Sequence, residues 1–152
     1  MTCQEVAQPG PDGFTIPGIA QTIPLMPPNN CYANAKLLAQ EYPGLTYQEG
    51  VQVARVSGEL RASLRHAWNV GPAGQTIDAT EDTGSALIAE LFGEKVTYDY
   101  IPDGPEHDAE RQAAEDELGK PDEDEEDPTF DGDQLAAEWL EQARRPGCER
   151  GE

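Results

Sequence analysis

Acidic residues gather in the last third of this 152-residue chain, and their distribution limits where a core can form. Residues 103–152 hold 19 acidic and 5 basic residues, whereas residues 1–102 hold 11 acidic and 5 basic residues. A segment with so many like charges and few apolar side chains does not bury enough apolar surface to fold alone. We therefore expect a core at residues 31–102 and a largely disordered acidic tail at residues 103–152.

The same charge argues against several classes of partner. The formal net charge is −20, which would repel nucleic-acid phosphates and makes a polybasic membrane anchor implausible. No apolar stretch approaches the length of a membrane span, and residues 1–8 lack the features of a signal peptide. We expect no nucleic-acid partner, no membrane partner and a cytoplasmic location, in the host cytoplasm if a phage encodes the chain.

The cysteines are Cys3, Cys31 and Cys148. An odd number without regular spacing argues against a disulfide framework, and the lack of a CxxC pair argues against a structural zinc site. The sequence therefore predicts a protein of a reducing compartment that holds no metal and no cofactor.

Residues 9–30 contain six prolines and three glycines, which exclude a long helix. Several isoleucines, Leu25 and Met26 nevertheless make this stretch apolar. We predict that residues 1–30 form an extended, proline-rich arm that lies on the core.

A helix is predicted at residues 31–42. Its apolar side chains recur at offsets of 0, 4, 7 and 11, which is one helical face, and a Pro-Gly pair follows it. Asn29 and Asn30 are suitable N-terminal caps. Cys31 is therefore expected in the first turn, on the face that points inward.

The pattern then changes to period two. Strands are predicted at residues 45–57, 64–70, 75–80 and 95–101, with a helix at residues 81–92. The second and third strands are joined by a Gly-Pro-Ala-Gly turn, which is typical of an antiparallel hairpin. The order predicts an α+β fold, with an antiparallel sheet packed on the N-terminal helix that carries the cysteine.

Within the acidic tail, residues 121–128 are almost entirely acidic and are predicted to be disordered. Residues 133–145 are different, because Trp139 and its apolar neighbours form a stripe at helical spacing. We expect a short amphipathic helix there, held on a flexible tether and able to contact a protein partner.

Cys31, His66 and Asp78 have the side chains of a nucleophilic site. A thiol needs a base to become a thiolate, the base needs an orienting acceptor, and a helix N-terminus favours the negative charge. If Val70 pairs with Gly74 across the hairpin, Asp78 lies directly opposite His66. Each residue taken alone has an ordinary structural explanation, and their joint occurrence on these elements is what indicates a site.

Two short segments also resemble a known family. They are His66-Ala67-Trp68 and Asp78-Ala79-Thr80, which follow a cysteine at a helix start. This order resembles the transglutaminase-like branch of the papain-type cysteine enzymes. The chain also resembles small bacterial and phage relatives that share a Cys-x-x-Asn-Ala segment, a Glu-Gly strand and a later Phe-Gly pair. The resemblance covers residues 29–101.

The resemblance implies a role for each matched residue. Cys31 would be the nucleophile, His66 the general base and then acid, and Asp78 the group that orients His66. The backbone N–H of Cys31 would donate to an oxyanion, with Asn29 or Asn30 as a second donor. The resemblance also implies that Trp68 forms a wall of the substrate site and that Glu49 contacts the substrate. The expected function is a thiol-dependent hydrolase or acyl transferase that acts on a peptide, protein or small amide.

Two alternatives remain open. The chain could be a non-catalytic acidic inhibitor or adaptor, such as one that a phage encodes, that binds a basic protein surface through its tail and the Trp139 helix. Cys31, His66 and Asp78, with His107, would also be chemically acceptable zinc ligands, although no closely spaced pair nucleates such a site.

Overall fold

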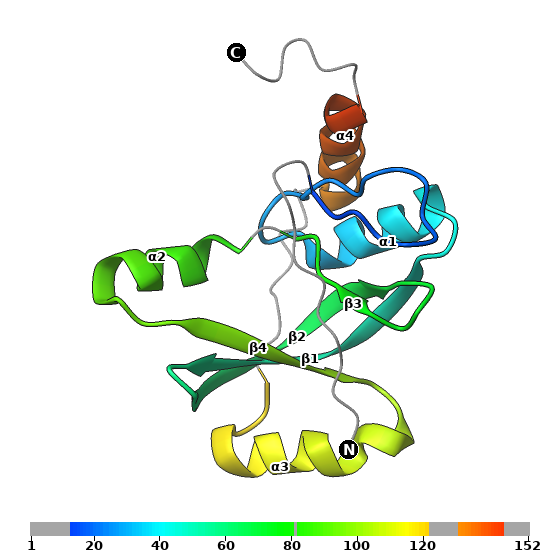
Figure 1. The fold of residues 1–152 in the computed structure, drawn as a ribbon. Coiled ribbons are helices and arrows are strands. Elements are labelled where there is room, and N and C mark those ends of the chain that lie inside the picture. The colour runs from blue at the N-terminus through cyan, green and yellow to red at the C-terminus, as the bar shows by residue number, and fades with distance from the viewer. Residues whose placement is uncertain (1–12, 81, 122–130, 145–152) are drawn as a thin grey trace. The chain divides into compact units, whose positions relative to one another are not determined.

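The computed structural model describes residues 13–80, 82–121 and 131–144. Its elements follow one another along the chain as shown in Figure 1. They are α1 (Cys31–Glu41), β1 (Thr46–Val56), β2 (Glu59–Val70), β3 (Thr76–Ile77), α2 (Thr83–Phe92), β4 (Val96–Pro102), the 3-10 turn η1 (Pro105–His107), α3 (Asp108–Leu118) and α4 (Gly132–Arg144). Among the described residues, no helix is long and apolar enough to cross a membrane.

The four strands form one sheet in the order β3-β2-β1-β4. β1 pairs antiparallel with β4, with Gly50 opposite Pro102 and Val56 opposite Val96. β2 pairs antiparallel with β3. The predicted α+β class with an antiparallel sheet is therefore confirmed, and each predicted helix and strand has a counterpart in the structure.

The chain divides into two compact units that do not follow the predicted boundaries at residues 30 and 102. Among the described residues, the first unit comprises residues 13–47, 68–80 and 131–144, and the second comprises residues 48–67 and 82–121. Each unit has its own apolar core.

The N-terminal arm is part of the core of the first unit. Phe14 and Ile23 exchange backbone hydrogen bonds of 2.7 and 2.9 Å, and both side chains are buried together with those of Ile16 and Met26. Residues 13–30, predicted as part of an extended arm, thus contribute side chains to this core, and residues 1–12 lie outside the described part of the chain.

Helices α1 and α4 pack against each other in the first unit (Figure 1). The C-terminal helix was expected at 133–145 and is found at Gly132–Arg144, but its expected separation from the core is wrong. Ala136 and Leu140 are buried beside Leu38 of α1, because their spacing puts both on one face of α4. The segment predicted to be disordered, residues 121–128, falls outside the described residues from residue 122 onward.

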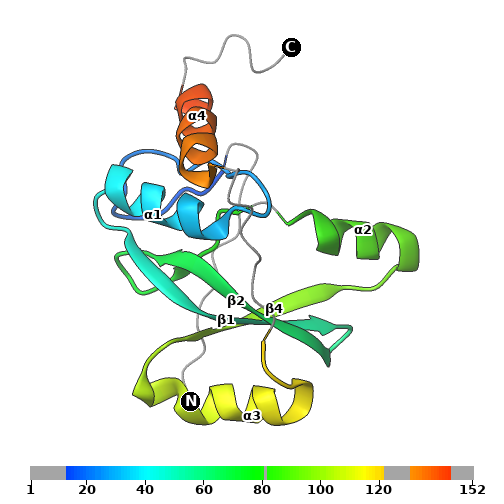
Figure 2. The same ribbon diagram turned by 180° about the vertical axis from the view of Figure 1, so that it is seen from behind.

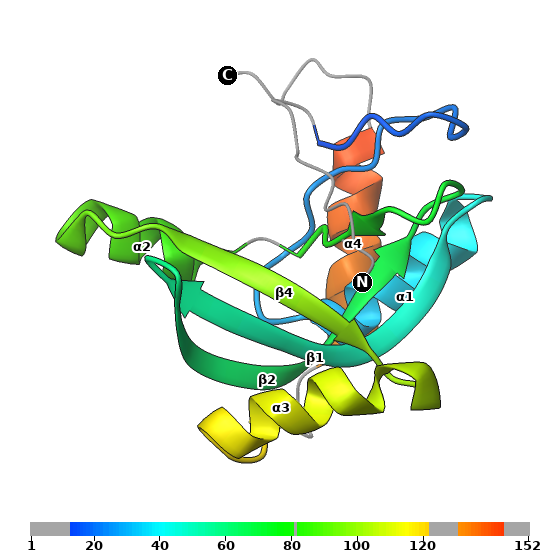
Figure 3. The same cartoon turned by 60° about the horizontal axis from the view of Figure 1, so that its bottom comes forward.

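The second unit corrects the expectation of a disordered tail. Residues 105–118 form η1 and α3, and Figure 3 shows α3 lying along the strands of the sheet. Ala114 is buried against Val51, Val53 and Ile101, and Leu118 packs at the edge of this cluster. One apolar residue per turn of an otherwise acidic helix is enough to attach it to the sheet, while its charges stay in water.

Helix α2 leads into β4 in the same unit (Figure 2). Gly93 follows the helix with φ of 68°, a left-handed conformation that favours glycine, and its N–H donates to the carbonyl oxygen of Ala89 at 2.9 Å. The predicted helix and its glycine end are therefore confirmed. β4 alternates between half-buried and exposed side chains up to Tyr100, as its sequence predicts.

Candidate functional site

Cys31 is the first residue of α1, and it is only 3% exposed. Asn30 occupies the N-cap position, but its side chain makes no capping hydrogen bond, so this predicted cap is wrong. Its amide nitrogen donates instead to Asn34 Oδ1 and to the carbonyl oxygen of Gly132, both at 3.0 Å. The Asn30 amide thus connects the start of α1 to Gly132, the first residue of α4.

The two predicted oxyanion donors differ in what their amides do. The side chain of Asn30 is buried, and its two donated hydrogen bonds use both of its N–H groups. Asn29 is exposed and has a φ of 59°, a left-handed conformation that asparagine tolerates. An oxyanion donor needs an N–H aimed at the reacting atom, so Asn29 is the better of the two candidates.

Asn34 makes buried hydrogen bonds near the start of α1, and the sequence interpretation did not assign it this role. It is buried one turn along α1, and its amide nitrogen donates to Pro27 O and to Thr80 Oγ1, both at 2.9 Å. These bonds attach the start of α1 to the segment that follows β3. The available signal was an asparagine inside a helix, where this residue is a poor helix former and is usually retained for a hydrogen bond.

The hairpin register differs from the one predicted. Val70 pairs with Thr76, not with Gly74. The loop is longer because Gly71 N–H donates to the carbonyl oxygen of Gln75 at 2.9 Å, which closes a five-residue connection. The side chain of Gln75 also accepts a hydrogen bond of 2.9 Å from the backbone inside the loop.

The new register moves the position opposite Asp78. Asn69 pairs with Ile77, the last residue of β3. Continued by one residue, this register puts Trp68 opposite Asp78. The predicted pairing of Asp78 with His66 is therefore wrong by two residues. Side chains alternate between the two faces of a strand. A shift of two residues therefore leaves each side chain of β2 on the face that was predicted for it.

His66 lies in β2 and is buried, although it is polar. Its ring centroid is 6.3 Å from that of Tyr100 in β4, with 42° between the ring planes. Gln52 of β1 is also buried, lies opposite Tyr100 in the register, and donates to the Tyr100 hydroxyl at 3.2 Å. We call His66, Gln52 and Tyr100 the polar row. The sequence interpretation missed Gln52, although a glutamine between two valines in a strand was a signal for a buried polar contact.

Trp68 was expected to wall the site. It is 1% exposed and is the largest fully buried side chain of the described residues. This burial is equally typical of a core aromatic, which is the ordinary explanation for a tryptophan in a central strand.

Glu49 was expected to contact substrate, and it belongs to a charged group. Glu49 Oε1 is 3.8 Å from Arg65 Nη2, and Arg65 makes two hydrogen bonds of 2.8 and 2.6 Å to the carboxylate of Asp103. Arg111 of α3 approaches the same carboxylate at 4.0 Å. The hydrogen bonds from Arg65 lower the pKa of Asp103 from its usual value of 3.8.

The predicted site residues belong to both units. Five of them lie in the first unit and two in the second. The first group is Asn29, Asn30, Cys31, Trp68 and Asp78, and the second is Glu49 and His66.

The zinc alternative finds no ligand cluster in the described part of the chain. No three side chains of the types His, Cys, Asp and Glu are grouped as a metal site would require there. His107 lies in η1, where its ring nitrogens are 3.1 Å from Glu110 Oε1 and 3.8 Å from Glu106 Oε2. Its neighbours are therefore two carboxylates of the acidic segment.

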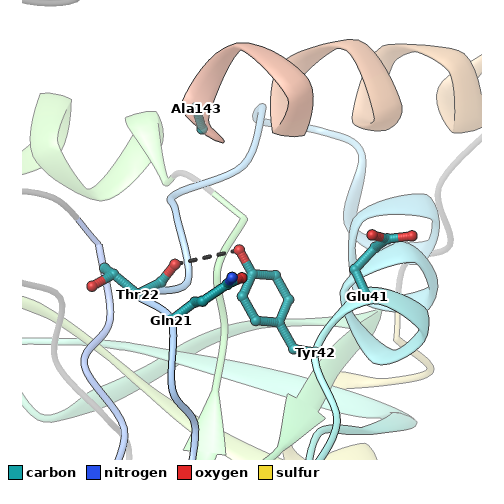
Figure 4. A pocket seen from close by; sticks show the side chains of 5 residues that line it. All are labelled: Gln21, Thr22, Glu41, Tyr42 and Ala143. Carbon is teal, nitrogen blue, oxygen red and sulfur yellow. Dashed lines mark hydrogen bonds between the residues drawn. The ribbon is translucent and has the colours of Figure 1, made fainter. Parts of the chain in front are cut away.

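The first unit has a shallow pocket of about 480 Å³ that none of the predicted residues lines. Figure 4 shows its side chains, with a dashed line for the hydrogen bond of 3.3 Å from the Tyr42 hydroxyl to Thr22 O. The lining residues are Gln21, Thr22, Glu41, Tyr42 and Ala143. They come from the arm and from the C-terminal ends of α1 and α4.

Comparison with known proteins adds no family to this geometry. No protein-family model, curated protein or solved structure matches the chain. The resemblance to transglutaminase-like enzymes therefore rests on the residues and motifs alone.

Proposed function

We propose that this protein is a thiol-dependent hydrolase or acyl transferase that acts on an amide or peptide bond. Cys31 is the nucleophile, His66 is the general base and then the general acid, and Asp78 orients His66. The observation that carries the proposal is a buried cysteine at the first residue of α1, where a helix favours negative charge.

The reaction divides into two steps. In the first, Cys31 Sγ adds to the amide carbonyl carbon while His66 takes the thiol proton. The C–N bond then breaks, the amine leaves with the proton from His66, and a thioester remains on Sγ. In the second, water or another amine attacks the thioester through His66, which releases a carboxylic acid or a new amide and restores the thiol.

The surroundings of the three residues support these roles. Asn34, three residues after Cys31, donates to Thr80, two residues after Asp78, so a hydrogen bond joins the segments that carry the proposed nucleophile and orienting acid. His66 is held beside the Tyr100 ring in the polar row. A catalytic imidazole needs its ring orientation fixed by its neighbours, and burial between strands supplies that restraint.

The test uses a variant in which Cys3 and Cys148 are serine, so that Cys31 is the only thiol. We expect iodoacetamide to alkylate Cys31 faster than it alkylates glutathione at pH 7, and we expect His66→Ala to abolish the difference. The matched control is His107→Ala, because the chain has only two histidines. A buried cysteine without a base would react more slowly than glutathione in every variant, and that result would refute the proposal.

Turnover gives a second readout. We expect a burst of 4-nitrophenol from 4-nitrophenyl acetate, as an acyl-enzyme accumulates, and its loss in Cys31→Ala. Full turnover by Cys31→Ala would show that Cys31 is not the nucleophile.

A second candidate function is an acidic binding protein without catalysis. Helix α3 favours it, because it carries five acidic residues and one arginine, and its acidic side chains are largely exposed. Deleting residues 103–152 would not test it, since α3 and α4 contribute buried residues to the two cores. The sharper test replaces Glu110, Asp116 and Glu117 by their amides and measures the affinity for a polylysine peptide, which should fall while Cys31 alkylation stays unchanged.

A further inference from the structure

The C-terminal half of α2 exposes three large apolar side chains. Leu87, Leu91 and Phe92 are 54%, 64% and 69% exposed, and they are the most exposed large apolar residues of the described part of the chain. Leu87 and Leu91 are four residues apart, so they lie on one side of the helix, and Phe92 adjoins them on its last turn. We call these three side chains the α2 patch. Clustered exposure of this kind marks an interaction surface more often than an isolated exposed leucine does.

Negative charge predominates near the α2 patch. Residues 82–95 contain three acidic residues and one basic residue, Lys95, and Glu90 and Glu94 are exposed beside the patch. The patch also lies at the C-terminal end of α2, where the helix dipole is negative. The second unit as a whole, residues 48–67 and 82–121, has 13 acidic and 6 basic residues.

Within the described residues of the second unit, no element covers the patch. α2 lies near the end of the strands where β4 begins (Figures 1, 2 and 3). α3 packs instead on Val51, Val53 and Ile101 of the sheet. Leu87, Leu91 and Phe92 are therefore open to a partner molecule.

We propose that the α2 patch is a docking surface for a protein segment that carries apolar side chains flanked by lysine or arginine. The apolar groups would cover Leu87, Leu91 and Phe92, and the basic groups would face Glu90 and Glu94. A second copy of the chain fits less well. A symmetric contact would bring the same two glutamates of each copy together between molecules of net charge −20. This docking surface is independent of the proposed catalytic role of Cys31.

The test uses three fluorescent peptides of 16 residues. The first consists of Leu and Lys (Leu/Lys), the second of Ser and Lys (Ser/Lys), and the third of Leu and Glu (Leu/Glu). We expect fluorescence anisotropy to give the tightest binding for Leu/Lys, and the double variant Leu87→Ser/Leu91→Ser to weaken it by roughly tenfold. Binding of Ser/Lys should stay the same, because the variant changes no charge. Leu25→Ser is the matched control, since Leu25 is an exposed leucine outside α2.

Three results would overturn the proposal. They are equal binding of Leu/Lys by the wild type and the double variant, equal binding of Leu/Glu and Leu/Lys, and a dimer in sedimentation that the double variant abolishes. The last result would make a second copy the occupant. Phe92→Gln with thermal melting keeps the test valid if the double variant unfolds, because this single change lies at the exposed end of the helix and should weaken Leu/Lys binding alone.

Discussion

The two units of this molecule are held together by different interactions. The first has a cluster of 11 buried apolar residues. It also contains hydrogen bonds donated by the side-chain amides of Asn30, Asn34 and Asn69. The second has a cluster of only four, and at its edge exposed ion pairs join Arg65 to Asp103 and Arg55 to Asp99. An acidic chain can thus fold in two ways, by burying apolar surface away from its charges or by pairing some of them. The first unit should respond to cavities and lost amides, and the second to pH and salt.

The largest expected effect is in the core of the first unit. Leu38 is completely buried there, so Leu38→Ala should lower the free energy of unfolding by about 2–5 kcal/mol, through lost burial and the cavity it leaves. Urea titration followed by tryptophan fluorescence measures it, because both tryptophans, Trp68 and Trp139, belong to this unit. Lys36→Ala, at an exposed position of the same helix, should change little. Equal effects of the two substitutions would contradict the description of this core.

The next effect concerns the amides that distinguish the first unit. Asn34→Ala removes the donor to Pro27 O and Thr80 Oγ1 and leaves the Asn30 amide without its Asn34 acceptor. Unsatisfied buried polar groups should cost about 1–3 kcal/mol. Tryptophan-monitored unfolding measures the loss, and exposed Gln40→Ala on the same helix is the control. A neutral Asn34→Ala would mean that apolar burial alone holds the first unit.

Much of the fold could be predicted from the sequence, because its signals are local. Periodicity located α1, β1, β4 and α4 within one or two residues, and glycine marked the end of α2. The hairpin register could not be predicted, because it depends on how Gln75 closes the loop with Gly71. The α3 helix was hidden by its charge, since only Ala114 and Leu118 attach it to the sheet.

The candidate site could be predicted only as a set of residue types. Cysteine, histidine and aspartate on particular elements are visible in a sequence, and Cys31 does begin its helix. The partners of these residues were not visible, because hydrogen bonds such as that from Gln52 to Tyr100 join positions far apart in the chain. For the same reason Asn30 was predicted as a cap, whereas its amide reaches Gly132, more than a hundred residues away.

A smaller effect tests the charged edge of the second unit. Asp103→Asn removes the carboxylate that Arg65 holds, and the loss should be about 1 kcal/mol or less because the pair is partly exposed. Since the pKa of Asp103 is lowered on folding, its contribution is complete above the usual pKa of 3.8 and is lost as the pH falls through the folded value. Hydrogen exchange of the α3 amides at pH 3 to 6 measures it. Exposed Glu117→Gln is the control, and identical pH profiles for the two variants would contradict the role of Asp103.

An effect of similar size connects the second unit to the proposed chemistry. Tyr100→Phe removes the hydroxyl that accepts from Gln52 and keeps the ring beside His66, so it should cost only about 0.5–1.5 kcal/mol. If the polar row positions His66 as the base for Cys31, the same change should slow Cys31 alkylation well beyond what this loss of stability explains. Tyr98→Phe is the matched control, because the Tyr98 hydroxyl donates to Asp82 outside the row. Equal alkylation rates in Tyr100→Phe and Tyr98→Phe would mean that the polar row is only a structural contact. It would then support the sheet without tuning the proposed site.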